Sequence, residues 1–443
     1  MSPAAREART IARLAGPVVA TQLGGMMLGV VDNLMLGHYS VEALSASSLG
    51  RVWVFGTMML AEGVLHGLDP IFSQAHGARD RGRLGAALQT GLVLALLFSL
   101  PVGLLWLATG PVLVLLGQDP QLAAMAGDYA LARLPGLPMV LSFVVLRGWM
   151  QGRGIVRPAM WAVLVANVFN VVANWLLIFG NLGCPRLGVA GAGLATAITQ
   201  VAMVASLLLV VRGFRLGRGA WAGWERAALR GRGAREIAGY GLPIALQFGL
   251  EIWAFQIATL WAGELGTVPL ASHTIALNLA SVSFMVPLGV SIGATTRVGN
   301  LIGARRPADA QRAAWVSLAM GCGAMAAFAL CFVLARYELP ALYSADAGVI
   351  ALAASILPVA AAFQVFDGTQ VVGGGILRGM GRTRPAAVMH LVAFYGVGLP
   401  LSWLFAFRAG LGLVGIWWGL AVGLAVVALA LTLWIARRGP AHA

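Results

Sequence analysis

The chain has 443 residues, of which 59% are hydrophobic and 10% are charged, and its formal net charge is +14. A soluble globular protein carries about 25% charged residues, so this composition excludes a water-soluble fold and indicates a protein embedded in lipid. The sequence contains no lysine, and its arginines are spread over short loops, which indicates cytoplasmic loop charge and no nucleic-acid partner.

Continuous apolar runs, each long enough to cross a bilayer as a helix, recur along the chain. We expect about twelve spans, at residues 14–37, 47–66, 84–107, 124–146, 158–180, 188–212, 236–263, 268–292, 311–334, 348–376, 386–406 and 412–436. The second is the least regular, because Arg51, Glu62 and His66 lie in or beside it. The runs do not alternate as in a β-barrel, so the sequence predicts an all-α polytopic membrane protein.

Arginines concentrate in alternate loops, beginning with the N-terminus and ending with the last residues of the chain. Loops of this kind stay on the cytoplasmic side of the membrane. We therefore expect a multi-pass protein of the cell's inner membrane with both termini cytoplasmic, which requires an even number of spans.

The sequence repeats itself at a shift of about 226 residues. Pro17 aligns with Pro243, Leu44 aligns with Leu270, and the order of further matching segments is kept. The repeat predicts two pseudo-symmetric six-helix halves, residues 1–212 and 236–443, with an arginine-rich cytoplasmic linker at 213–235.

Three acidic residues, Asp32, Glu251 and Asp367, lie well inside apolar spans. A charged side chain at the centre of a bilayer costs about 3 kcal/mol on insertion scales, which favours a functional role. No arginine at a mid-span position offers itself as a partner, so we expect each carboxylate to take up a proton or to hold a cation. Both states suit a carrier coupled to protons or sodium. The alternative is that an acid only anchors neighbouring helices.

Polar residues stand at helical spacing near these acids. Gln247 precedes Glu251 by one turn on the same face. Asn170 and Asn174 belong to a polar stripe on the fifth span, and Thr196 lies on the sixth. Hydrogen bonds that only join helices are the alternative explanation for the stripe.

Pro17 and Pro243 fall near the starts of the first and seventh spans. A proline inside a helix bends it and frees a carbonyl group, so we interpret both residues as helix hinges. A fixed bend without a role in gating is the alternative.

The sequence has no pattern typical of an enzyme or of a bound cofactor. The motifs of zinc proteases, α/β-hydrolases and nucleotide-binding loops are missing from it. The three cysteines form no CxxC pair, and the histidines lack the spacing of metal ligands.

Four segments together resemble the multidrug and toxic compound extrusion (MATE) family, and within it the NorM-type branch. They are VDNLMLGHYSVEALSA (31–46), GYGLPIALQFGLEIWAF (239–255), ALNLASVSFMVPLGVSIGATTRVGNLIGA (276–304) and FDGTQVVGGGILRGMGRTRP (366–385). The resemblance covers roughly residues 10–436. It implies an antiporter of two six-helix lobes that exports organic cations in exchange for sodium or protons.

The same resemblance implies roles for individual residues. Asp32 falls where the family keeps a first-span acid tied to proton or substrate handling, and Glu251 and Asp367 fall where NorM-type members bind the coupling cation. Phe363 stands where some members carry a tyrosine, and it keeps a π face for a cation contact.

A second set of positions matches only in part. Asn170, Asn174 and Thr196 fall where another branch of the family has an Asn/Asp/Thr network around the first-span aspartate. The position of Asn174 is an aspartate in that branch, so this chain lacks one charge of the network.

Two other functions fit a protein of this build. A flippase for lipid-linked precursors, or an exporter of another small metabolite, would have a similar helix count. Acidic charges inside the spans favour a cationic cargo over an anionic headgroup. A channel or an assembly factor would not need buried acids in both halves. We expect the carrier to be monomeric.

Overall fold

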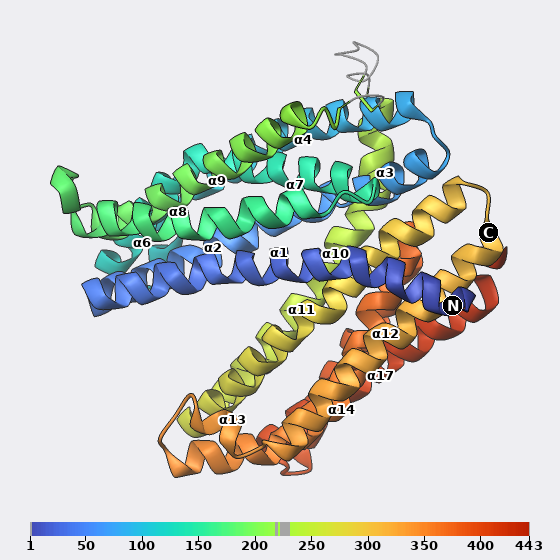
Figure 1. Cartoon of the computed structure of the whole chain (residues 1–443). Helices are drawn as coiled ribbons and strands as arrows, with labels where there is room; N and C mark the ends of the chain where they lie inside the picture. The colour runs from blue at the N-terminus through green and yellow to red at the C-terminus, as the bar shows by residue number, and fades with distance from the viewer. Residues whose placement is uncertain (1, 218–219, 222–230, 443) are drawn as a thin grey trace. The chain divides into compact units, whose positions relative to one another are not determined.

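The computed structural model describes residues 2–217, 220–221 and 231–442, and these residues form helices without a single strand (Figure 1). The predicted linker at 213–235 falls partly on residues 218–219 and 222–230, which lie outside the described residues. In the first half, the helices are α1 (Pro3–Tyr39), α2 (Val41–Leu65), α3 (Leu68–Gly77), α4 (Arg81–Leu107), α5 (Thr109–Leu115), α6 (Pro120–Arg133), η1 (Leu134–Gly136), α7 (Leu137–Gly152), α8 (Arg157–Phe179), η2 (Asn181–Gly183) and α9 (Gly188–Gly213).

The second half repeats this helical build. Its helices are α10 (Arg232–Glu264), α11 (Thr267–Gly303), α12 (Pro307–Leu334), α13 (Glu338–Ala341), α14 (Ala347–Gly379), α15 (Thr383–His390), η4 (Leu391–Gly398), α16 (Leu399–Trp403), η5 (Leu404–Arg408), α17 (Gly412–Arg438) and η6 (Pro440–His442). The segments η4 and η5 are π-helical and are parts of one continuous helix, Thr383–Arg408.

Eleven described helices are long and apolar enough to cross a membrane, which confirms the polytopic all-α prediction. The predicted second span is helical as α2 and has 25 residues, but it is not among the eleven. Arg51 and the serines of SASS (45–48) make this helix less apolar than the others. Helices α1 and α11 extend well beyond the predicted spans, because a helix need not end where the lipid does.

Contacts divide the structure into two compact units. Unit 1 holds the described residues of Met1–Val19, Gly77–Arg79 and Leu246–Ala443, and unit 2 holds those of Ala20–His76 and Asp80–Ala245. Helices α1 and α10 therefore each begin in one unit and continue in the other. The two units therefore differ from the predicted halves, 1–212 and 236–443, at the starts of α1 and α10.

In unit 2, the start of α10 packs against two glycines that stand four residues apart. A Cβ atom added to Gly63 would lie 2.6 Å from the Cα atom of Ala245. One added to Gly67 would overlap the carbonyl oxygen of Ile237. Small residues at this spacing let two helix backbones approach closely.

Unit 1 repeats this packing with the start of α1. Gly289 faces Val19, and Gly293 faces Ile11. Each of these four residues stands 226 positions away from its counterpart in unit 2, which is the shift of the sequence repeat. The repeat is therefore a repeat of contacts as well as of sequence.

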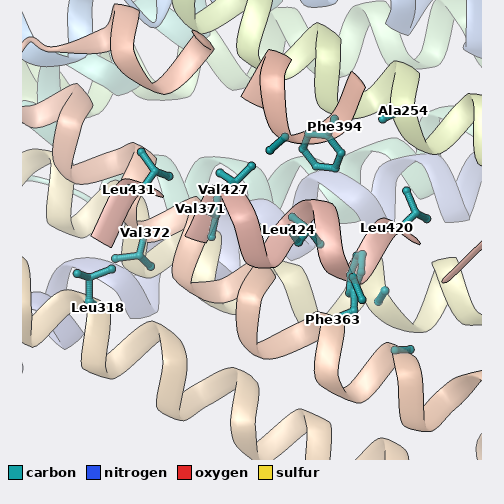
Figure 2. Packing of buried hydrophobic residues seen from close by; sticks show 14 of the residues in the cluster. Ala254, Leu318, Phe363, Val371, Val372, Phe394, Leu420, Leu424, Val427 and Leu431 are labelled. Atoms are coloured by element: carbon teal, nitrogen blue, oxygen red, sulfur yellow. The ribbon is translucent and has the colours of Figure 1, made fainter. Parts of the chain in front are cut away.

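A continuous apolar core holds α14 in the middle of unit 1. Figure 2 shows Val371 and Val372 of α14 beside Leu424, Val427 and Leu431 of α17. Helices α11 and α12 pack on α14 as well. A helix surrounded in this way has a fixed orientation, so it can hold polar side chains in defined places.

Candidate functional site

In unit 2, Asp32 of α1 lies at the centre of a buried polar cluster. Its side chain is 5% exposed. Asn174 of α8 donates from Nδ2 to Oδ1 of Asp32 over 2.6 Å, and the Thr196 hydroxyl of α9 donates to Oδ2 over 2.9 Å. Both donors come from helices far along the chain, so the fold delivers them to the carboxylate.

Asn170 extends the cluster by one helical turn. Asn174 Nδ2 also donates to Asn170 Oδ1 over 3.1 Å. Asn170 also interacts with the Asp32 carboxylate through its side chain, and Asn174 Oδ1 has no hydrogen-bond partner among the described residues, although both side chains are fully buried. A free acceptor beside a carboxylate suits a bound water or a polar atom of a cargo molecule.

Arg133, at the end of α6, corrects the expectation that no mid-span arginine accompanies the acids. It interacts electrostatically with Asp32. Its guanidinium donates to the Tyr129 hydroxyl over 2.7 Å and lies over the Tyr129 ring, 5.4 Å from the centroid. Arg133 falls inside the predicted fourth span, so its position in the sequence was the available signal.

In unit 1, one amide joins the two acids of the second half. Gln370 Nε2 donates to Oε1 of Glu251 on α10 and to Oδ1 of Asp367 on α14, in each case over 3.0 Å. Asp367 is 4% exposed and Gln370 is fully buried, whereas Glu251 is half-buried. Two carboxylates from different helices are thus brought to one donor group.

Two more buried side chains complete this cluster. Gln370 Oε1 lies 2.8 Å from Nε2 of His390 on α15, and Gln247 Nε2 lies 3.3 Å from the same His390 nitrogen. The other ring nitrogen, Nδ1, lies 2.8 Å from the Ala386 carbonyl oxygen. Gln247 therefore reaches the acids through His390 and Gln370.

Phe363 lies one helical turn before Asp367, in an aromatic group. Its ring is edge-to-face with Phe255 at 5.8 Å and with Trp417 at 5.5 Å between centroids. Phe363 is 2% exposed and is labelled in Figure 2. These rings form an apolar wall next to the carboxylates.

The arrangement of unit 1 can bind a small cation. Carboxylate and amide oxygens are the ligands that hard cations prefer, and either carboxylate can instead accept a proton. No group of three or more His, Cys, Asp or Glu side chains that could hold a metal ion occurs in the part of the chain that the structure describes. Oxygen donors beyond the two acids would have to come from amides, the backbone or water.

Comparison with known proteins decides the family. The family model described as MatE matches residues 17–176 and 243–404. The chain belongs to the MATE family. The two matched segments begin at Pro17 and Pro243, which confirms the repeat at a shift of 226 residues.

Curated relatives in the MATE family match nearly the whole chain. The multidrug resistance protein NorM of Burkholderia vietnamiensis is 36% identical over 431 residues, which cover 96% of this chain and 92% of that protein. A probable NorM of Pseudomonas putida is 37% identical over 438 residues, with 96% and 93% covered. Membership in a family of transporters confirms the prediction that the chain is not an enzyme.

Solved structures of MATE proteins share the fold. A eukaryotic MATE transporter, AtDTX14, has a TM-score of 0.90 and 26% sequence identity, with 99% of this chain and 98% of that chain covered. The outward-facing conformation of a multidrug resistance MATE family transporter has a TM-score of 0.87 and 20% identity, with 98% and 96% covered.

Sequence reasoning missed Gln370 and His390. Gln370 follows Asp367 by three residues, so helical spacing alone places both on one face of α14. His390 offered no comparable signal, because it reaches Gln370 only through the packing of α15 against α14.

Proposed function

We propose that this MATE family protein is a secondary antiporter that exports organic cations in exchange for Na⁺ or H⁺. It works by alternating access between two six-helix lobes, in the cell's inner membrane with both termini cytoplasmic. One observation carries the proposal: the carboxylates of Glu251 and Asp367, from different helices, share the amide of Gln370 in a buried setting.

The acid pair supports coupling to an ion. Two carboxylates held at one donor repel each other when both are ionised, and a bound Na⁺ or a proton relieves that repulsion. Ion binding therefore changes the electrostatics between α10 and α14. A carrier needs such a dependence of its structure on the bound ion.

The cluster at Asp32 supports a cargo that is cationic. Its carboxylate is the buried acid of the α1–α8–α9 cluster, and the free amide oxygen of Asn174 lies beside it. The relatives are named multidrug resistance proteins, which suggests chemically varied organic cargo.

Transport by purified protein in proteoliposomes tests the proposal. Ethidium, a fluorescent organic cation, would be followed with a Na⁺ gradient and a pH gradient imposed separately. We expect at least one gradient to drive uphill ethidium movement by the parent. Glu251→Gln and Asp367→Asn should each abolish this movement while the proteins remain folded.

Glu264→Gln is the matched control, because Glu264 is exposed near the end of the same helix as Glu251. It should transport at the parental rate. Ethidium movement that ignores both gradients, or that survives in Glu251→Gln and Asp367→Asn, would overturn the proposal.

A further inference from the structure

The amide nitrogen of Gln370 has two hydrogens, and the structure directs them to two different carboxylates. The acceptor oxygens are Glu251 Oε1 and Asp367 Oδ1, each 3.0 Å away. Glu251 stands on α10 and Asp367 on α14, so the amide is the bridge between two helices. A hydrogen bond to an ionised oxygen contributes about 1.5–3 kcal/mol, more than one between neutral groups.

Carboxylates of equal charge do not stay together without such a bridge. If the amide were missing, repulsion would favour rotamers that separate the two side chains. A cation would then have to gather them again, and its binding would be weakened by that cost. A donor that holds the carboxylates in place before the ion arrives avoids it.

The amide of Gln370 is itself held from behind. Its oxygen lies 2.8 Å from His390 Nε2, so the imidazole packs directly behind the amide and limits how the amide can turn. Gln247 of α10 lies 3.3 Å from the same nitrogen. Gln247 is 4% exposed, and Gln370 and His390 are fully buried, so water does not compete for these contacts.

The π-helical segment η4 explains how His390 comes to face α10. A π-helix closes its hydrogen bonds between residues five apart, which brings residues at that spacing onto one face. Tyr395 stands five positions after His390, and its hydroxyl donates to the Leu250 carbonyl oxygen over 3.2 Å. His390 and Tyr395 thus bind α10 on either side of the turn that precedes Glu251.

We infer that Gln370 is a positioning residue of the coupling-ion site: its amide holds the carboxylates of Glu251 and Asp367 together, and His390 packs behind the amide. This inference rests on the proposed antiport, since the ion it serves is the one that drives ethidium movement.

Gln370→Leu tests the inference in proteoliposomes. The half-saturating concentration of the driving ion, Na⁺ or H⁺, and that of ethidium would both be measured. We expect the value for the ion to rise at least about tenfold, because the substitution removes hydrogen bonds to two carboxylates and one such bond is already worth about that factor. The value for ethidium should stay within about twofold of the parent, because the Asp32 cluster is untouched.

Gln364→Leu is the matched control. Gln364 lies on the same helix, is fully buried, and donates to the Ser283 hydroxyl rather than to an acid. If Gln370 were only a buried structural residue, Gln370→Leu and Gln364→Leu would change the half-saturating ion concentration equally. Thermal unfolding in detergent measures the loss of stability in each variant. Equal half-saturating ion concentrations in the Gln370→Leu variant and the parent would overturn the inference.

Variants of His390 test the inference independently of Gln370→Leu. His390→Leu leaves the amide in place but free to rotate, so the half-saturating ion concentration should rise about threefold. His390→Gln offers a donor and an acceptor again and should restore the parental value. If Gln370→Leu does not fold, these two variants decide, and equal values for both contradict the inference.

Transport by the parent and by Glu251→Gln tests the proposed antiport separately from the role of Gln370. If no ion gradient drives ethidium in the parent, or if Glu251→Gln pumps normally, the proposed antiport fails. If the parent is ion-driven and Glu251→Gln is inactive, but Gln370→Leu keeps its ion dependence, only the inference about Gln370 fails.

Discussion

Arg297 of α11 and Glu7 of α1 form a bidentate ion pair across 290 positions of the sequence. Nε donates to Oε2 over 2.7 Å, and Nη2 donates to Oε1 over 2.6 Å. Both residues belong to unit 1, although α1 continues in unit 2 after Val19. The pair therefore holds the start of α1 beside Gly289 and Gly293 of α11, against which it packs.

Loss of this pair should reduce stability more than loss of its exposed counterpart. Glu7 and Arg297 have side chains 11% and 25% exposed, whereas Glu236 and Arg83, which pair over 2.6 Å in unit 2, are about 40% exposed. Glu7→Gln should cost about 1–3 kcal/mol of stability, and Glu236→Gln about 0–1 kcal/mol. Thermal unfolding of the purified variants in detergent checks this order, and an equal loss in both would show that burial does not matter here.

Glycine packing predicts a difference between two equivalent positions. A Cβ atom at Gly67 would overlap the Ile237 carbonyl, but one at Gly293 would lie 3.4 Å from the Ile11 carbonyl oxygen, an ordinary contact. We expect Gly67→Ala to cost about 1–3 kcal/mol of stability, and Gly293→Ala to be close to neutral. Unfolding midpoints of the two variants measure the difference. The packing account is wrong if Gly293→Ala is the more damaging change.

The prolines of α1 and α10 stand two residues before each helix changes unit, at Val19 and Ala245. If these sites act as hinges, Pro17→Ala and Pro243→Ala should slow ethidium export without lowering stability, because alanine favours a straight helix. Pro101→Ala in α4, a helix that stays within unit 2, is the control and should transport normally. Parental export by both hinge variants would leave the prolines as fixed bends.

Asp32→Asn separates a cargo or proton role from simple helix anchoring. Asparagine keeps the shape and still hydrogen-bonds to Asn174 and Thr196, but it holds no charge. We expect ethidium export to fall on the order of tenfold or more, since a lost charge in a low-dielectric site exceeds about 1.4 kcal/mol. Binding of ethidium to the detergent-solubilised variant, together with its unfolding midpoint, completes the measurement. Undiminished export would confine the functional site to unit 1.

The helices and the acids could be predicted from the sequence, because apolar length and the cost of a buried charge are local properties. Pro17 and Pro243 already marked the repeat. The contacts of Asp32 with Asn174 and Thr196 needed the fold, since helical spacing places residues on a face but not against a partner. For the same reason the sequence placed Gln370 near Asp367, three residues earlier on the same helix, but could not place it near Glu251. Nothing in the sequence indicated that His390 lies beside this pair.

The sequence also did not show that the first residues of α1 belong to unit 1 and the first residues of α10 to unit 2. The GxxxG spacings at Gly63 and at Gly289 are visible in the sequence and indicate close helix packing. Nothing in them tells which helix will pack there. The structure shows that Ile237 of α10 packs at Gly67 and Ile11 of α1 packs at Gly293.

The central claim is that ion and cargo move in opposite directions through one protein. The direct measurement is ion movement driven by cargo alone: proteoliposomes with equal Na⁺ and pH on both sides are given an ethidium gradient, and internal Na⁺ and pH are followed. We expect Na⁺ or H⁺ to move against the direction of ethidium, and this movement to vanish in Glu251→Gln. Ethidium flux without any counter-movement of Na⁺ or H⁺ would contradict the account.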